Sequence, residues 1–335
     1  MQRREFLKAA AVAGVAAATT SNLLGQAQTE TASSSSEMQY RTLGRTGVKV
    51  SAIGLGGYHI GVQSDPAESV RMIRTAIDRG ITFMDNSCDY NNGASESRMG
   101  DALKDGYRNK VFLMTKIDGR SAQSFNTQLE QSLARLKVDT IDLMQFHEII
   151  RMEDPDRIFA AGGALEAALA AQKAGKIRYI GFTGHKDPAI HLRTFEIAQQ
   201  HGFHFDTVQM PINVLDAHFR SFLKQVVPVA NAQGTAVLAM KTLSAGILLR
   251  NTTVSAIEAL HYALSQPVSV VVTGMDTMQI MEQAFTAMRT FKPLTESETA
   301  SLLARTRDAA LSGQFEPFKT TARFDGSARN PDWLG

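Results

Sequence analysis

Short apolar runs alternate with longer amphipathic stretches from residue 40 onward. The apolar runs are nearly continuous, which is typical of parallel strands covered on both faces. After a small hairpin (40–43 and 48–50), the runs predicted as strands are 53–55, 81–85, 111–115, 140–146, 177–181, 207–210, 236–240 and 268–272. The stretches predicted as helices are 66–79, 95–104, 121–136, 163–174, 189–200, 217–232, 254–265 and 278–288.

This alternation predicts an α/β protein built as a (β/α)₈ TIM barrel, because each strand is followed by a helix. The competing architecture, an open doubly wound sheet, would carry a Gly-x-Gly-x-x-Gly turn after its first strand. Gly54-Leu55-Gly56-Gly57-Tyr58 does not supply that turn. A further helix near 296–312 and a tail containing Pro331-Asp332-Trp333 predict a C-terminal helical extension. We therefore expect residues 37–335 to form one barrel domain with an N-terminal β-hairpin.

The first 36 residues have the composition of an export signal followed by a spacer. Arg3-Arg4-Glu5-Phe6-Leu7-Lys8 precedes an Ala-rich apolar run (9–18) and a Ser-rich stretch, with a possible cleavage point at Ala27. The paired arginines resemble the twin-arginine (Tat) motif, with Gln2 at a position where Ser or Thr is common. This resemblance implies the Tat translocase as a partner and a periplasmic location. The apolar run is too short for a stable membrane anchor. The alternative is an ordinary amphipathic helix on a cytosolic protein.

The composition excludes several classes of function. The chain has 335 residues, 44% of them hydrophobic, with 35 basic and 33 acidic residues and a net charge of +2. This balance gives no basic surface for nucleic acid and no polybasic segment for a membrane. The single cysteine, Cys88, excludes an internal disulfide, an iron–sulfur cluster and a zinc site of several thiolates. Because neighbouring strand ends also lack clustered His and Asp ligands, we expect no metal and no metal-dependent hydrolase.

Polar residues follow three consecutive predicted strands. Asp85 ends the second strand with Tyr90 close behind it, Lys116 ends the third and His147 ends the fourth. In a barrel these positions meet at the C-terminal rim, where catalytic residues lie. A phenol titrates near pH ~10, and a nearby ammonium held by a carboxylate is expected to lower that pKa. A neutral His would orient a substrate oxygen. This set suits proton transfer to a carbonyl oxygen, with hydride supplied by a nicotinamide cofactor.

These residues lie in motifs that resemble the aldo-keto reductase family. Asp85-Asn86-Ser87-Cys88-Asp89-Tyr90 is followed by Gly93, Ser95, Glu96 and Gly100, and Thr115-Lys116 and Gln145-Phe146-His147 match the next two motifs. Asn86-Ser87 stands where many members have Thr-Ala. The resemblance covers about residues 40–290. It implies Tyr90 as the general acid/base, Lys116 and Asp85 as the pair that tunes it, and His147 as the group that orients the substrate.

The second half of the chain resembles the family's cofactor-binding half, with departures. Thr183 replaces a Ser and Gly184 an Asn that bind the carboxamide of the nicotinamide, and His185 is a possible substitute for that Asn. Gln209 matches the family's amide ligand. Met240 replaces the aromatic residue that stacks on the nicotinamide. Lys241 either reaches a phosphate or is solvated. The remaining expected cofactor-binding residues are Gly56, Leu243, Gly246, Gly274, Glu282 and Gln283.

Cofactor choice stays open between NADP and NAD. Family members selective for NADP place a basic residue near the eighth strand, whereas residues 274–283 have no Lys or Arg and carry Asp276 and Glu282. The sequence therefore predicts an NAD(P)-dependent oxidoreductase that interconverts a small carbonyl compound and an alcohol. The alternative is a cofactor-sensing regulatory protein of the same fold, because some family members are channel subunits.

Overall fold

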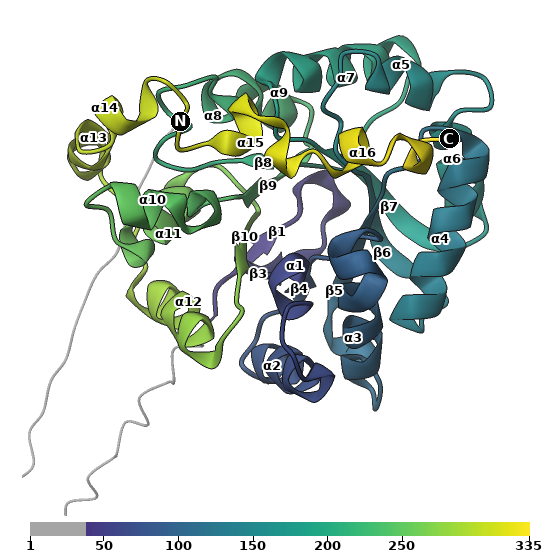
Figure 1. Ribbon diagram of the computed structural model, residues 1–335, viewed down its shortest axis with the longest axis horizontal. Helices are drawn as coiled ribbons and strands as arrows, with labels where there is room; N and C mark the ends of the chain where they lie inside the picture. The colour runs from purple at the N-terminus through teal and green to yellow at the C-terminus, as the bar shows by residue number, and fades with distance from the viewer. Residues whose placement is uncertain (1–37) are drawn as a thin grey trace, which may run out of the picture. The chain divides into compact units, whose positions relative to one another are not determined.

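The computed structural model describes residues 38–335 (Figure 1). Its centre is a closed barrel of parallel strands in the order β10-β3-β4-β5-β6-β7-β8-β9. The strands are β3 (Ile53–Gly56), β4 (Phe83–Met84), β5 (Phe112–Ile117), β6 (Ile141–Phe146), β7 (Ile177–Thr183), β8 (Thr207–Pro211), β9 (Ala236–Met240) and β10 (Val270–Gly274). The predicted TIM barrel is confirmed.

Helices surround the barrel, and the predicted C-terminal extension is present. The helices of eight or more residues are α2 (Pro66–Asp78), α3 (Ala94–Ala102), α4 (Ala122–Leu136), α6 (Ala164–Lys173), α7 (Pro188–Gln200), α11 (Ala256–Ser265), α12 (Met278–Thr290) and α13 (Glu296–Ala304). The shorter ones are α1 (Gly57–Ile60), α5 (Asp154–Phe159), α8 (Phe222–Gln225), α9 (Val227–Ala232), α10 (Ile247–Asn251), α14 (Arg307–Ala310), α15 (Pro317–Thr320) and α16 (Gly326–Arg329). Within residues 38–335, no helix combines the length and apolar character needed to cross a membrane.

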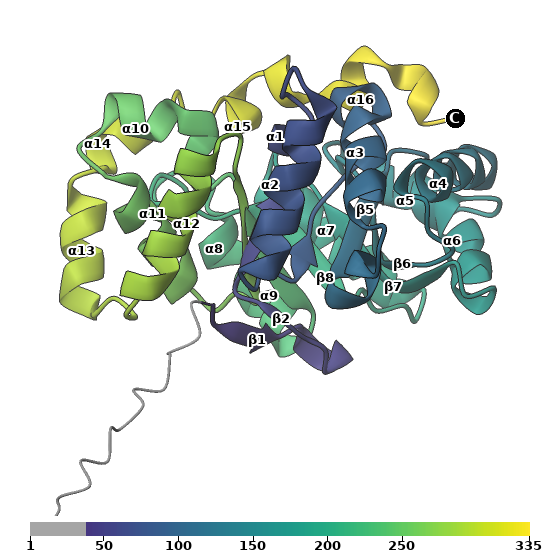
Figure 2. The same cartoon turned by 90° about the horizontal axis from the view of Figure 1, so that it is seen from below.

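Two hydrophobic layers hold the barrel together. Alternate strand residues fill its interior, among them Phe83, Phe112, Leu143 and Leu238, and the opposite strand faces pack against the helices. The interior layer also includes Val50 from the hairpin of β1 (Tyr40–Thr42) and β2 (Lys49–Ser51). The hairpin lies at the end of the barrel opposite the C-terminal segment (Figure 2). One end is therefore plugged, and the other carries the strand ends that form the candidate site.

Three predicted elements differ from the structure for local reasons. The expected helix 217–232 is two short helices, α8 and α9, because Pro228 at the start of α9 has no N–H for a continuous helix. The expected strand 268–272 is shifted to 270–274, the residues that pair with β3. The expected helix 296–312 is interrupted after Ala304 and resumes at Arg307. Helix α5 was not expected.

The C-terminal segment, residues 313–335, lies across the ends of several strands (Figure 1). The Asp325 carboxylate pairs with the side chains of His185 and Lys186, both in the loop after β7. Glu148, after β6, accepts hydrogen bonds from the backbone N–H groups of Gly326 and Ser327 at 2.9 and 2.7 Å. These contacts place the segment over the rim where catalysis is expected.

Candidate active site

The four predicted catalytic residues are gathered at one rim of the barrel. Asp85 directly follows β4, Tyr90 opens a 3₁₀ turn after it, Lys116 lies in β5 and His147 follows β6. Lys116 Nζ lies 2.7 Å from Asp85 Oδ1 and donates to the Tyr90 hydroxyl at 3.1 Å. The rings of Tyr90 and His147 meet edge-on with centroids 5.8 Å apart. The phenol, the ammonium and the imidazole therefore share one small volume.

Lys116 is held rigidly. Its side chain is 1% exposed, and it also donates to the Asn86 carbonyl at 2.6 Å. With Asp85 and the Tyr90 hydroxyl, this accounts for the three donors of the ammonium. The ammonium is therefore fixed in place, with one of its N–H groups directed at the phenol oxygen.

The pKa of Tyr90 runs opposite to the sequence expectation. Burial raises the pKa of the phenol well above its usual value, and the carboxylates of Asp85, Asp89, Glu148 and Asp118 raise it further. Lys116 was expected to lower this pKa. One ammonium, itself paired with Asp85, does not outweigh desolvation together with four negative groups. The phenol is therefore protonated at neutral pH, the form needed to donate a proton.

His147 is also different from the neutral imidazole that was expected. Its Nδ1 lies 3.0 Å from Asp118 Oδ1, 3.5 Å from Asp89 Oδ1 and 3.2 Å from Ser87 Oγ. Burial by itself lowers the pKa of His147, but Asp89 and Asp118 together raise it above its usual value. A raised pKa favours the doubly protonated ring, in which Nδ1–H meets the carboxylates and Nε2–H can donate to a substrate oxygen.

Two residues that position His147, Asp118 and Arg120, were not predicted from the sequence. Asp118 and Arg120 follow Lys116 by two and four residues, so their position just beyond a strand end was the available signal. Arg120 is fully buried and donates to the carbonyls of His147 and Glu148 at 2.7 and 3.0 Å. It also pairs with Asp154 at 3.2 Å. Arg120 therefore fixes the backbone that carries His147.

Asp89, Asp118 and His147 each bring one possible ligand atom within 4.8 Å of the others, the one such group in the described part of the chain. The imidazole and Asp118 are already at hydrogen-bonding distance. We therefore interpret the cluster as the charge environment of His147.

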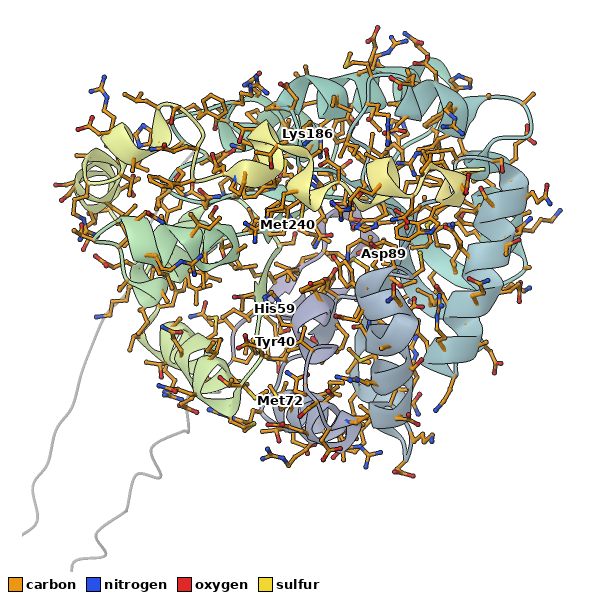
Figure 3. All side chains as sticks on the ribbon, in the orientation of Figure 1. Tyr40, His59, Met72, Asp89, Lys186 and Met240 are labelled. Atoms are coloured by element: carbon orange, nitrogen blue, oxygen red, sulfur yellow. The ribbon has the colours of Figure 1, made fainter. Side chains whose placement is uncertain are left out.

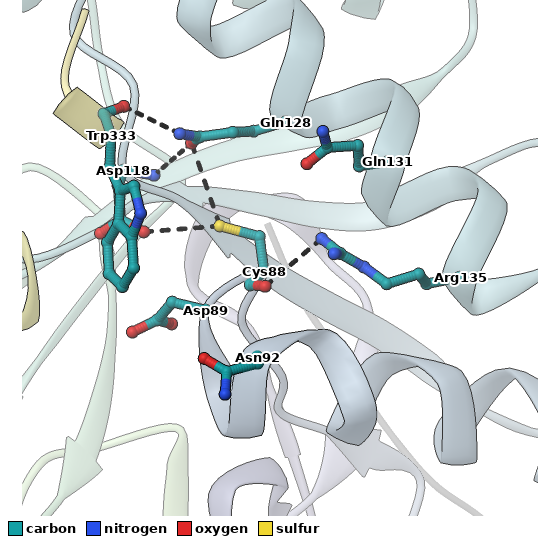
Figure 4. Close-up of a pocket in the computed structure, with 8 residues that line it drawn as sticks. All are labelled: Cys88, Asp89, Asn92, Asp118, Gln128, Gln131, Arg135 and Trp333. Carbon is teal, nitrogen blue, oxygen red and sulfur yellow. Dashed lines mark hydrogen bonds between the residues drawn. The ribbon is translucent and has the colours of Figure 1, made fainter. Parts of the chain in front are cut away.

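A cavity of about 240 Å³ adjoins this cluster. Figure 4 shows it between the loop carrying Cys88 and Asp89, helix α4, and Trp333 near the C-terminus. Cys88 Sγ donates to Asp118 at 3.4 Å, and Gln128 Nε2 donates to the Trp333 carbonyl at 2.8 Å. Tyr90, Lys116 and His147 do not line this cavity, so it is a neighbour of the candidate site.

Two amide side chains at the rim have buried atoms without partners. Gln209, in β8, donates Nε2 to Asp85 at 3.4 Å, while its Oε1 is buried and unpaired. Asn86 Nδ2 is likewise buried and unpaired. A buried polar atom without a partner is costly, and a ligand amide would satisfy one acceptor and one donor. One unpaired donor and one unpaired acceptor are the complement of a carboxamide group, such as that of a nicotinamide.

Thr183, Gly184 and His185 lie at the end of β7. A Cβ on Gly184 would lie 2.3 Å from the Ile149 carbonyl oxygen and 2.7 Å from His191. A side chain such as that of Asn therefore does not fit here unless the Ile149 backbone moves. His185 does not take its place, since its Nε2 lies 3.1 Å from Asp325 Oδ1 and the ring is turned toward the C-terminal segment.

Gly184→Asn is expected to lower the free energy of unfolding by about 1–3 kcal/mol, the usual cost of overpacking. Chemical denaturation of both proteins measures the change. Gly162→Asn is the matched control, because φ is +71° there and nothing lies within 4 Å of an added Cβ. Asn tolerates that backbone region. A Gly184→Asn protein as stable as the control would contradict the crowding argument.

The cofactor-binding residues expected after β9 lie in different surroundings. Met240 and Lys241 are half-buried at the strand end, and Figure 3 shows Met240 near the middle of the molecule, between His59 and Lys186. Leu243 packs against the helices that precede the C-terminal segment. Gly246, with φ of +76°, forms the cap of α10.

The residues expected after β10 form two separate groups. Gly274 in β10 pairs with Gly56 in β3. A Cβ added to Gly274 would lie 2.2 Å from His59 Nδ1, and one added to Gly56 would lie 2.9 Å from the Thr273 carbonyl oxygen. Glu282 is exposed on α12 and pairs at 2.7 Å with both Arg79 and Arg289, while Gln283 beside it is half-buried. Two arginines thus lie beside this segment, Arg289 in α12 and Arg79 at the C-cap of α2, and both are paired with Glu282.

Comparisons with known proteins identify the family of this chain and agree with its fold. The model of the Aldo/keto reductase family matches residues 52–257. The Bacillus subtilis proteins "Aldo-keto reductase YhdN" and the oxidoreductase YrpG are 32% and 31% identical to this chain, each over 63% of it, and the matches cover 64% and 68% of those proteins. The chain thus spans about two thirds of the length of these curated relatives. The structure of aldo-keto reductase AKR11C1 from Bacillus halodurans (holo form) superposes with a TM-score of 0.68 at 23% identity, covering 83% of this chain and 99% of that one.

Proposed function

The chain belongs to the aldo/keto reductase family, and we propose that it is an NAD(P)-dependent reductase of aldehydes or ketones with Tyr90 as its general acid. The observation that carries this proposal is the contact of Lys116 Nζ with both Asp85, at 2.7 Å, and the Tyr90 hydroxyl, at 3.1 Å. This arrangement suits a phenol that gives up a proton beside a fixed positive charge.

The protein's own groups would divide the work at the carbonyl oxygen. His147 Nε2–H and the Tyr90 hydroxyl bind that oxygen and orient the carbonyl. Tyr90 then transfers its proton to the oxygen, and Lys116 stabilises the phenolate that remains. The raised pKa of Tyr90 favours the protonated phenol and therefore the direction of reduction. A reduced nicotinamide, when bound, supplies the hydride that reaches the carbonyl carbon.

The unpaired amide atoms of Asn86 and Gln209 support a nicotinamide near Tyr90. The holo form named for the Bacillus halodurans structure also supports a bound cofactor in this fold. Of the other expected residues, Thr183, Met240 and Gly274 are the last residues of β7, β9 and β10, Leu243 and Gly246 follow β9, and Gln283 lies within α12. NADP and NAD are both kept as candidates, because Arg79 and Arg289 are already engaged by Glu282.

A turnover assay separates an enzyme from a cofactor sensor. The purified protein is mixed with NADPH or NADH and a panel of aldehydes and ketones, and the absorbance of the reduced nicotinamide is followed. We expect a carbonyl-dependent loss of absorbance with at least one cofactor. Tight cofactor binding without turnover on any carbonyl of the panel would instead support the regulatory protein.

We also propose that the protein is exported by the Tat translocase to the periplasm. Arg3 and Arg4, on which this rests, lie outside the described residues. Replacing both with Lys is expected to leave a folded enzyme in the cytoplasm, because Tat recognition requires the paired arginines. Cell fractionation with immunoblotting measures the distribution. A double variant found in the periplasm at the wild-type level would contradict the export proposal, and activity in the cytoplasmic fraction is the control for folding.

A further inference from the structure

Lys241 has an unusual backbone conformation at the end of β9. Its φ is +53°, in the left-handed region that a residue with a side chain seldom adopts. Its carbonyl is fixed in place, because it accepts hydrogen bonds from Asn213 Nδ2 at 3.2 Å and from Ser244 N–H at 2.9 Å. A strained residue at a strand end of a barrel is a common feature of functional sites.

The ammonium of Lys241 is not paired within residues 38–335. Its Nζ lies 5.6 and 5.5 Å from the ring centres of Phe318 and Phe324, both in the C-terminal segment, and it makes no hydrogen bond or ion pair with the described residues. The other lysines of this region are matched: Lys116 with Asp85, and Lys319 with Asp216 and Glu316.

The same charged groups surround Lys241 and Tyr90. Burial lowers the pKa of Lys241 to about 8, and its charged neighbours are Glu148, Lys116, Asp85 and Asp89. Three of these, the carboxylates, also act on Tyr90. Glu148 does not neutralise Lys241, since its oxygens accept from the N–H groups of Gly326 and Ser327. The Lys241 ammonium therefore lies within electrostatic reach of the carboxylates that surround Tyr90.

We propose that Lys241 Nζ binds a carboxylate carried by the carbonyl substrate, so that the substrates are oxo acids and aldehyde acids. A single ammonium flanked by two phenyl rings matches a monovalent anion attached to an apolar body. The rings belong to the C-terminal segment, whereas Gly274, Glu282 and Gln283, which are expected to hold the nucleotide, lie in β10 and α12. This inference rests on the proposed reductase function and names its substrate class.

The test compares an aldehyde acid with its methyl ester, for example 4-oxobutanoate with methyl 4-oxobutanoate. We expect wild type to prefer the acid in kcat/KM, and Lys241→Met to reduce the acid-to-ester ratio by roughly 10- to 100-fold, the usual strength of a hydrogen bond to a charged group. Lys241→Arg should keep a preference for the acid. Lys173→Met, at the exposed end of α6, makes the same charge change and should leave the ratio intact.

An equilibrium measurement keeps the inference independent of turnover. Phenylacetate and phenylacetamide are titrated into cofactor-saturated wild type and Lys241→Met, and the cofactor dissociation constant is measured for both proteins. We expect the acid to lose affinity in the variant, the amide to lose little, and the cofactor constant to stay the same. An unchanged acid-to-amide ratio, or a weakened cofactor with an unchanged ratio, would overturn the inference. Acid-selective binding without reduction of any carbonyl would support the inference while contradicting the reductase function.

Discussion

Tyr90→Phe is expected to lower kcat for carbonyl reduction by roughly 10²- to 10⁴-fold, because the general acid is removed while the ring is kept. The edge-on contacts of this ring with Tyr58, at 5.7 Å, and with His147, at 5.8 Å, do not involve the hydroxyl. The site should therefore retain its shape. Steady-state kinetics at pH 7 with saturating cofactor measures the effect.

The matched control for Tyr90→Phe is Tyr107→Phe, which removes the hydroxyl that donates to Asp78 on the surface. This variant should keep wild-type turnover. The dissociation constant of the cofactor should be similar in all three proteins. Carbonyl reduction by Tyr90→Phe at the wild-type rate would show that another group delivers the proton.

Lys319→Met is expected to cause the largest loss of stability, about 3–5 kcal/mol in the free energy of unfolding. Lys319 Nζ lies 2.7 Å from Asp216 and 3.0 Å from Glu316, and all three side chains are fully buried. It also donates to the Phe219 carbonyl at 2.8 Å. Removing the ammonium leaves two buried carboxylates and a carbonyl without their partner. Urea denaturation followed by circular dichroism measures the change.

The loss from Lys319→Met should be larger at pH 8 than at pH 5. Burial raises the pKa of Glu316 to about 7, so this carboxyl stays protonated in the folded protein at pH 5 and is ionised at pH 8. Because the pKa of Glu316 is raised in the folded protein, the free energy of unfolding falls as pH rises through the folded pKa of Glu316. This fall is greater when the Lys319 ammonium is absent. Lys173→Met is the surface control. Equal destabilisation at both pH values would contradict the role assigned to Glu316.

Much of the fold could be predicted because its signals are local. The parallel strands are continuous apolar runs, and helices such as α2 and α7 begin where Asp65 and Asp187 accept from the backbone just before a proline. The path of the C-terminal segment could not be predicted in this way. It depends on contacts such as that of Glu148 with Gly326, which join residues 178 positions apart.

The meeting of Asp85, Lys116, His147 and Tyr90 followed from the barrel, since consecutive strand ends share a rim. The protonation states of Tyr90 and His147 could not be predicted from the barrel, because each pKa depends on burial and on all the nearby charges together. Asp118 and Asp89 raise the pKa of His147 above its usual value, and burial together with nearby carboxylates raises the pKa of Tyr90. Gly184 was identified as a departure from the family, but its cause, the nearby Ile149 carbonyl, lies on another loop.

Transfer of a deuterium label tests the central claim most directly. The enzyme is given reduced nicotinamide deuterated at C4 on the transferred face, with an aldehyde or ketone in ordinary water. The alcohol product is analysed by mass spectrometry and NMR. The account predicts one deuterium on the carbinol carbon and a hydroxyl proton from the solvent pool, with the label nearly absent from the product of Tyr90→Phe over the same time. An alcohol formed without deuterium at that carbon, or a cofactor that binds and is never oxidised, would contradict it.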